Sequence, residues 1–288
     1  MANAIMAFPI VSDNAAATYA GGSWVATLPL TNLQDDRLAR VTRSTSASLA
    51  NAQFTIDFGI AEWVRLVALV DHNFSRTSAV RVRGSNTPGD WTVTTYDSGW
   101  FDGWPITSPL YVAPVGDPSW LDGRMSAEEA ANYNLSAIYI AADEAAAQYW
   151  KIEISDIGNA AGYVQMGRLV MSKAWQPTIN MSVGATIGVS TETSFQRSDA
   201  GPKYFNVQPR ARSVAFTIDN METDEIFTYS FEMQRQLGLA EQLFFVWDAD
   251  DTVHLFRRSF LATLRELNPL EASSASFYDT ALSCEDVL

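Results

Sequence analysis

Short segments of this chain alternate apolar and polar residues, and this alternation constrains the fold more than any other feature. Residues 54–58 (FTIDF), 79–84 (AVRVRG) and 149–155 (YWKIEIS) carry apolar side chains at every second position. Such a period of two predicts strands with one face on a core and the other in solvent. Residues 64–70 (VRLVALV) are almost continuously apolar, which predicts a central strand covered on both faces. The strands together predict an antiparallel β-sandwich. We expect these side chains in its core: Leu66, Ala68, Val70, Trp150, Ile152 and Ile154.

The order of these strands resembles the discoidin-like, galactose-binding-type jelly roll. An early FTIDFG strand is followed by VRLVALVDHN, VRVRGSN and YDSG, and a late YWKIEISD…GYVQMGRLVM closes the set. The segments LVDHNFS and GRLVMSKAWQP are most similar to structural tail proteins of long-tailed bacteriophages, which lie at the distal end of the tail. The resemblance rests on the amino-acid sequences of the predicted strands and not on a catalytic motif, so it implies a fold more than an activity. The late residues that carry it are Tyr149, Trp150, Ile152, Ile154, Gly162, Val164, Met166, Gly167 and Leu169.

The 288 residues are enough for two domains. We expect residues 1–174 to form the discoidin-like sandwich and residues 175–288 to form a smaller, mostly β assembly domain with one helix. Pro177 predicts a hinge at the boundary, because proline lacks a backbone donor and restricts the residue before it.

Further elements are predicted from local patterns. Residues 126–134 predict a short helix with a capping box made by Ser126 and Glu129, and residues 142–148 predict a turn of helix. A longer helix is expected at residues 223–239, ending at Gly238; its helically spaced side chains are Ile226, Phe227, Ser230, Phe231 and Gln234. The strands expected in the second domain are residues 179–193 and 212–220, a hairpin of 242–247 with 253–256, and residues 259–267 and 272–284.

Charge and cysteine content exclude several classes of partner. The net charge of −14 argues against nucleic acid, which needs a basic surface, and against an anionic membrane. No stretch approaches the about 18 apolar residues of a membrane helix, and the first residues do not read as a secretory signal. Cys284 is the single cysteine, so no intrachain disulfide is expected. This fits assembly in a reducing host cytoplasm.

The sequence carries no recognisable catalytic or metal-binding motif, and we expect neither an enzyme nor a cofactor. His72 and His254 are the only histidines, and neither stands in a nucleophile context. The turn at residues 248–251 (DADD) lacks the glycine and distal glutamate of an EF-hand. Discoidin-like modules often hold a structural calcium near their first loops, where this chain has Asn32, Asp35 and Asp36, but these do not make a complete ligand set.

Two segments are candidates for contacts with partners. Residues 99–124 form a long loop with Trp100, Trp104 and Trp120, which either folds back over the sandwich or contacts a subunit or ligand. Residues 181–193 lack the lysine and proline that protect exposed strand edges. They predict an edge that pairs with another chain, the alternative being an internal hairpin of 179–189 with 212–220. The contact residues expected here are Met181, Val183, Ile187 and Val189.

Two functional hypotheses follow. The first is a structural subunit of a bacteriophage tail tip or baseplate, located in the virion. Residues 176–288 would form a three-fold or six-fold ring with other copies and touch neighbouring tail proteins, while the jelly roll faces outward. The alternative is a glycan-binding module for host-surface recognition, with loop tryptophans as stacking platforms. We expect no nucleic-acid partner and no membrane insertion.

Overall fold

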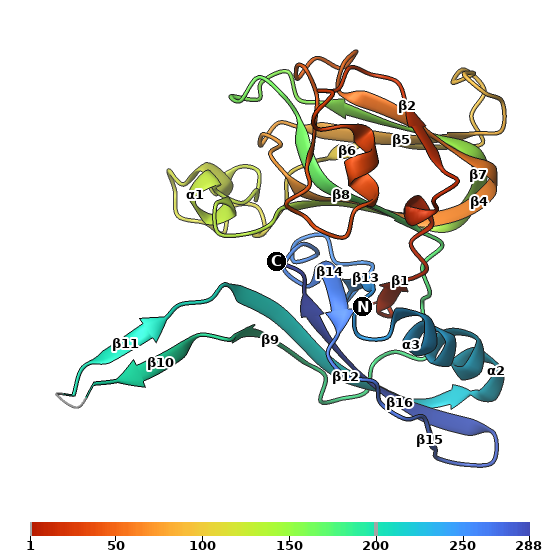
Figure 1. Cartoon of the computed structure of the whole chain (residues 1–288), viewed down its shortest axis with the longest axis vertical. Helices are drawn as coiled ribbons and strands as arrows, with labels where there is room; N and C mark the ends of the chain where they lie inside the picture. Colours follow the sequence, from red (N-terminus) through yellow and green to blue (C-terminus); the bar gives the residue numbers. More distant parts are fainter. Residues whose placement is uncertain (1, 199–200) are drawn as a thin grey trace. The chain divides into compact units, whose positions relative to one another are not determined.

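The computed structural model describes residues 2–198 and 201–288, and these divide into two compact units (Figure 1). The first unit comprises Ile5–Trp175 and Val246–Ser259. The second comprises Ala2–Ala4, Gln176–Phe245 and Phe260–Leu288. The sequence predicts a single boundary after residue 174. In the structure the main division lies between Trp175 and Gln176, and a short segment of the predicted second domain belongs to the first unit.

The first unit is built on an antiparallel sheet with the strand order β3-β8-β4-β7-β5-β6, in which β2 also pairs with β4. Helical segments are short and lie in the connections. The strands are β1 (Ile5–Ala7), β2 (Thr18–Ala20), β3 (Thr42–Arg43), β4 (Gln53–His72), β5 (Ala79–Ser85), β6 (Tyr96–Asp102), β7 (Ser136–Ser155) and β8 (Gln165–Ser172). The helical segments are η1 (Val11–Asp13), η2 (Leu30–Gln34), η3 (Pro118–Trp120) and α1 (Ala127–Ala130).

Strands β4 and β7 are each 20 residues long and curve around the core (Figure 1). The pairing of β4 with β7 shifts register between Asp57 and Glu62, and Gly59 adopts a φ of +76° there. The separate strands predicted at 54–58 and 64–70 are therefore one bent strand. The helical turn predicted at 142–148 is wrong. Residues 145–147 pair with residues 62–64 of β4, and these ladder bonds override the helix propensity of alanine.

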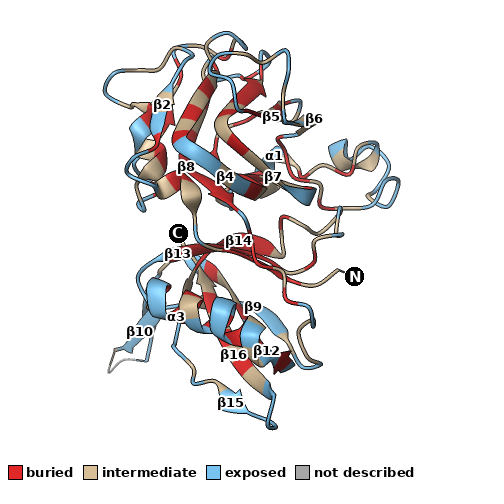
Figure 2. Cartoon of the chain, turned by 90° about the vertical axis from the view of Figure 1, so that its right-hand side faces the viewer, coloured by how far each residue is buried: buried red, intermediate tan, exposed pale blue. Residues whose placement is uncertain are grey.

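All six side chains predicted for the sandwich core are buried, and Trp150, Ile152 and Ile154 belong to its core cluster (Figure 2 colours buried residues red). Trp150, the largest of the predicted side chains, is 1% exposed, and its indole Nε1 donates to the Ala147 carbonyl oxygen at 3.0 Å. All five residues from Leu66 to Val70 are buried, but the core cluster of the sandwich contains Val67 and Leu69 instead of the predicted Leu66, Ala68 and Val70. The other predicted core residues, Ile152 and Ile154, are fully buried. The predicted mainly β fold class, with an antiparallel sandwich, is likewise confirmed.

The second unit contains a sheet with the order β13-β14-β16-β12-β9, with β15 beside β16. One helical segment, Thr223–Leu237, packs on it and ends before Gly238, as predicted. The strands are β9 (Thr186–Thr191), β10 (Ser194–Arg197), β11 (Lys203–Asn206), β12 (Arg210–Glu222), β13 (Gln242–Val246), β14 (Ser259–Leu264), β15 (Glu271–Ala272) and β16 (Phe277–Asp286). The helical segment consists of α2 (Thr223–Glu225), the π-helical η4 (Ile226–Phe231) and α3 (Glu232–Leu237).

Two local predictions are corrected by tertiary contacts. Residues 253–256 do not form a strand, and β13 lies beside β14 instead. The cap of α1 is present, since the Ser126 hydroxyl accepts from the Glu129 amide at 3.2 Å. The reciprocal half of the predicted capping box is replaced, because the Glu129 carboxylate accepts from Arg257 at 2.7 Å.

Candidate functional site

Strand β9 forms the edge of the second unit's sheet. It pairs with β12 from Thr186↔Ala215 to Thr191↔Arg210, so the internal hairpin considered as an alternative is present, with a shifted partner range. Among the described residues, no further strand pairs with the other edge of β9. Ile187 and Val189 share one face of β9 and are 43% and 68% exposed. Val183 lies in the preceding loop, fully exposed, and Met181 is partly buried.

Between β9 and β12 the chain continues into a two-stranded hairpin, β10 and β11 (Figure 1). We call this hairpin the arm tip, and the arm is the tip together with β9 and the paired part of β12. All eight strand residues of the tip are exposed. Phe195 lies directly opposite Phe205, with ring centroids 6.0 Å apart, and Tyr204 occupies the opposite face. These three aromatic side chains are 55% to 66% exposed, which gives the tip an apolar surface.

The sequence prediction of the contact surface ends at Thr193 and misses these aromatic residues. Residues 203–207 (KYFNV) carry the signal that points to them, a short β-prone run with exposed apolar side chains and no aspartate or glutamate. Residues 186–215 hold four basic and two acidic residues, in a chain with a net charge of −14, and one of the basic residues, Arg212, is paired with Asp286 at 2.6 Å. The Lys203 Nζ lies 4.6 Å from the centroid of the Phe195 ring. The arm is therefore apolar and basic on an acidic protein.

The three loop tryptophans do not form a common surface. Trp104 is buried, and its indole Nε1 donates to the Met125 carbonyl oxygen at 2.8 Å. It belongs to a small apolar cluster with Met125 and Phe256, so its predicted role as a contact residue is corrected to a packing role. Trp100, on β6, is 46% exposed. The partly exposed Trp120 packs its ring at 5.2 Å from Tyr111.

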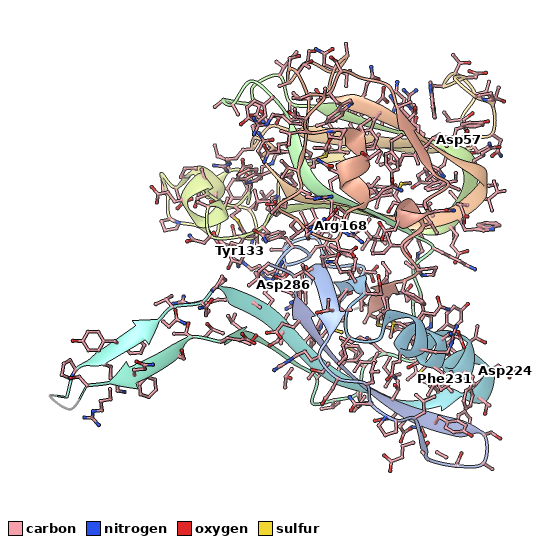
Figure 3. All side chains as sticks on the ribbon, viewed as in Figure 1. Asp57, Tyr133, Arg168, Asp224, Phe231 and Asp286 are labelled. Atoms are coloured by element: carbon pink, nitrogen blue, oxygen red, sulfur yellow. The ribbon has the colours of Figure 1, made fainter. Side chains whose placement is uncertain are left out.

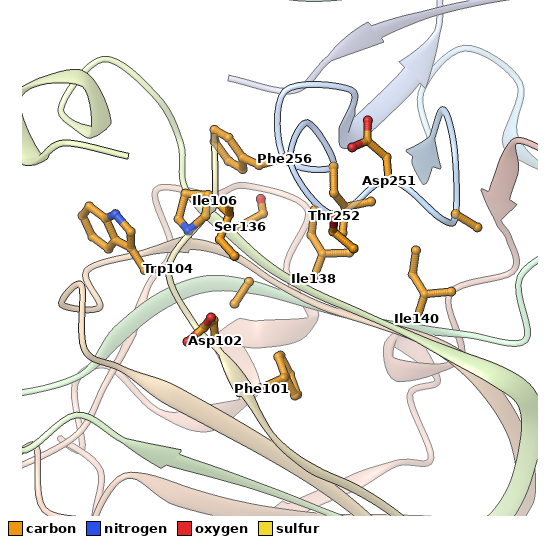
Figure 4. Close-up of a pocket in the computed structure, with 14 residues that line it drawn as sticks. Phe101, Asp102, Trp104, Ile106, Ser136, Ile138, Ile140, Asp251, Thr252 and Phe256 are labelled. Atoms are coloured by element: carbon orange, nitrogen blue, oxygen red, sulfur yellow. The ribbon is translucent and has the colours of Figure 1, made fainter. Parts of the chain in front are cut away.

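A pocket of about 320 Å³ lies beside Trp104 in the first unit (Figure 4). Its wall is mostly apolar, with Phe101, Ile138 and Phe256 among the residues that line it. Its two carboxylates are held by structural partners. Asp102 pairs with Arg124, while Asp251 accepts from the amides of Val253 and His254 and pairs with Arg258 at 3.1 Å. Both carboxylates that line the pocket are therefore engaged in ion pairs with arginine side chains.

The titratable groups suggested by the sequence have structural partners. The His72 Nδ1 accepts from the Phe74 amide at 3.2 Å, and burial lowers the pKa of His72 to about 3. Hydrogen bonds and ion pairs with Arg37 and Arg40 occupy Asp35 and hold its pKa well below the ordinary value. Within residues 2–198 and 201–288, no three His, Cys, Asp or Glu side chains are grouped to hold a metal ion. No described helix is both long and apolar enough to cross a membrane.

Comparison with known proteins gives structural neighbours only. No protein-family model matches the chain, and no curated protein matches it. Among solved structures, CBM32-1 from a family 31 glycoside hydrolase of Clostridium perfringens aligns with a TM-score of 0.36 at 10% identity, covering 55% of this chain and 94% of its own. The family 32 carbohydrate-binding module of Clostridium perfringens NanJ, in complex with galactose, gives 0.34 at 14% identity, with 58% and 98% covered.

A third neighbour is the lectin domain of lectinolysin complexed with Lewis B antigen, with a TM-score of 0.34 at 15% identity and coverage of 57% and 96%. At these identities and TM-scores, the similarities carry no conclusion about what this chain binds. None of the three is a bacteriophage tail protein, so the tail-tip role stays a prediction.

Proposed function

We propose that this chain is a structural subunit that assembles with other copies of itself through the arm. The observation that carries the proposal is the arm tip, a two-stranded hairpin with every strand residue exposed and three aromatic rings at its surface. An isolated two-stranded hairpin is marginally stable in water, because it has no core of its own. Pairing with a neighbouring subunit buries its aromatic rings and supplies the missing contacts.

The edge of β9 supports the same proposal. Ile187 and Val189 are exposed on a strand that lacks protecting lysine and proline. The resemblance of LVDHNFS and GRLVMSKAWQP to structural tail proteins points to the tail tip or baseplate of a long-tailed bacteriophage as the setting. In that setting the protein acts as a ring subunit of the virion, in contact with neighbouring tail proteins, and performs no catalysis.

The test removes the arm tip without disturbing the sheet. The Gln208 amide donates to the Thr193 hydroxyl at 3.0 Å, so the two ends of the tip are adjacent. Deleting residues 195–206 and joining Ser194 to Val207 through Asn-Gly gives a short hairpin. Light scattering after size exclusion should find an oligomer for the full chain and a folded monomer for the shortened one. A monomeric full chain at high concentration, or an unchanged oligomer after shortening, would refute the proposal.

A second candidate, glycan binding, rests on a different observation in the first unit. Tyr111 is 64% exposed in a left-handed backbone conformation, and its amide donates to the Trp120 carbonyl oxygen at 2.9 Å. The rings of these two residues form an aromatic corner in the loop 99–124. Exposed aromatic faces are suited to stacking on the apolar face of a sugar ring.

Calorimetric titration with galactose and with galactose-containing oligosaccharides tests this candidate. Tyr111→Ala should abolish binding while leaving oligomer size unchanged. Trp63→Ala is the matched control, because Trp63 is 51% exposed on β4. Equal binding by the Tyr111→Ala variant and the unmodified chain would remove the loop from consideration.

A further inference from the structure

The second unit carries an apolar groove of about 510 Å³ on its helical segment and the neighbouring loop. Phe227 and Phe231 of the helical segment line it together with Tyr278 of β16 and with Leu267 and Pro269 of the loop between β14 and β15. Phe227, Phe231 and Leu267 are 42% to 50% exposed. A soluble surface seldom leaves aromatic and aliphatic side chains together in this way without a partner. Figure 3 labels Phe231 on this segment.

The groove is built rigidly by the π-helical segment Ile226–Phe231. Ile226 and Ser230 are fully buried on its inner face, and the Ser230 hydroxyl is hydrogen-bonded to the Thr280 hydroxyl at 3.0 Å. This anchoring turns Phe227 and Phe231 outward. Their rings lie 5.8 Å apart, and the Phe227 ring meets Tyr278 edge-on at 5.4 Å. The exposed rings are therefore held in place before any partner binds.

The charges around the groove are opposite to those of the arm. Arg235 lines the groove and is paired with Glu232 at 2.6 Å, and the two segments that carry the lining residues, 223–241 and 264–279, together hold seven acidic and two basic residues. The two exposed strands of the arm tip carry Arg197 and Lys203 and no acidic residue. Complementary charge favours encounter between these two surfaces and disfavours contact of either with its own kind.

We propose that the arm tip of one copy occupies the groove of a second copy, so that Phe195 and Phe205 pack against Phe227 and Phe231. This inference rests on the proposed assembly function and names its contact. Within the second unit, the tip and the helical segment α2–α3 lie at opposite ends (Figure 1), so a copy does not fill its own groove. Such a contact is head-to-tail, and it generates a closed ring or an open filament.

Complementary variants test the contact. The shortened arm variant keeps the groove, and Phe231→Asp keeps the arm. Each alone should be monomeric, whereas an equimolar mixture should form a one-to-one dimer, because one arm and one groove remain. Leu267→Glu serves as a second groove variant, and the thermal unfolding transition shows whether each variant folds. If the shortened arm abolishes assembly but both folded groove variants assemble normally, the groove is wrong and the assembly function stands.

Cross-linking locates the contact directly. Cys284 is buried and burial raises the pKa of its thiol to about 12, so an introduced surface cysteine is the reactive one. Arg197 shares the face of Phe195 on β10 and is exposed. Oxidising a mixture of Arg197→Cys and Leu267→Cys chains should give a disulfide-linked dimer in at least tenfold excess over a mixture of Arg197→Cys and Val93→Cys. Val93 is the control because it is 75% exposed in the first unit. Equal yields from the two mixtures would overturn the proposal.

Discussion

Arg168 donates a hydrogen bond of 2.7 Å to the Asp13 carboxylate although its own side chain is only 1% exposed. The same guanidinium lies 3.1 Å from the Asp36 carboxylate. Arg168, labelled in Figure 3, is in the middle of β8, and Asp13 ends the short helix η1, so the interaction ties this N-terminal segment to the sheet. A buried cation needs such partners, because its desolvation is costly.

Removal of the Asp13 charge is predicted to destabilise the first unit. Asp13→Asn should lower the free energy of unfolding by roughly 3 kcal/mol, since it leaves a buried guanidinium with weaker compensation. Asp36→Asn is the control and should cost less, because the Asp36 side chain is 58% exposed. Urea unfolding followed by fluorescence measures both. Equal decreases in the free energy of unfolding for the two variants would mean that side-chain burial does not determine how much each carboxylate contributes to stability.

Trp150 is predicted to be the most sensitive aromatic position of the sandwich. Trp150→Ala removes a side chain that is 1% exposed and should cost about 3–5 kcal/mol, as large cavities do. Trp100→Ala, at a half-exposed ring on β6, should cost far less. The midpoint of thermal unfolding gives the comparison. An unchanged midpoint for Trp150→Ala would contradict the observed core.

Alanine substitutions at Gly22 and Gly89 should distinguish the cost of a left-handed backbone conformation from the cost of a steric clash. Both have left-handed φ angles, +65° and +73°. A Cβ at Gly22 would overlap the Gln53 carbonyl oxygen and lie 2.6 Å from that of Asn51, whereas a Cβ at Gly89 meets nothing within 4 Å. Gly89→Ala should cost about 1–2 kcal/mol for conformation alone. Gly22→Ala should cost clearly more, measured by denaturant unfolding, and a reversed order would argue against the close approach at Gly22.

The buried His72 is expected to make the stability of the folded protein depend on pH. Burial lowers its pKa from 6.5 to about 3, so the folded protein holds it neutral while the unfolded chain protonates below about pH 6.5. Its contribution to stability is complete above pH 6.5 and is lost as the pH falls toward 3. His72→Asn keeps an acceptor for the Phe74 amide and cannot titrate in this range. The stability of the native protein should therefore fall more steeply than that of the variant between pH 6.5 and 5. Parallel curves would exclude His72 as the titrating group.

The fold of the first unit was largely predictable because its signal is local. Alternation in 149–155 and the apolar run in 64–70 depend only on which side chains face a core, and the burial of Trp150, Ile152 and Leu66 follows from it. The stop of the helical segment at Gly238 is equally local, since glycine accepts the φ of +54° found there.

Contacts between distant residues decided the rest. Sequence alone predicted a helical turn at 142–148 and a strand at 253–256. In the structure residues 145–147 pair with β4 as part of a strand, whereas residues 253–256 have no strand partner among the described residues. The sequence also predicted Trp104 as a contact residue, because the neighbouring residues do not reveal that its indole donates to the Met125 carbonyl oxygen. The sequence determined that β9 is an unprotected strand. Only the tertiary structure placed it at a sheet edge, joined it to the exposed arm tip and turned Phe227 and Phe231 outward, since exposure depends on which surfaces the rest of the chain covers.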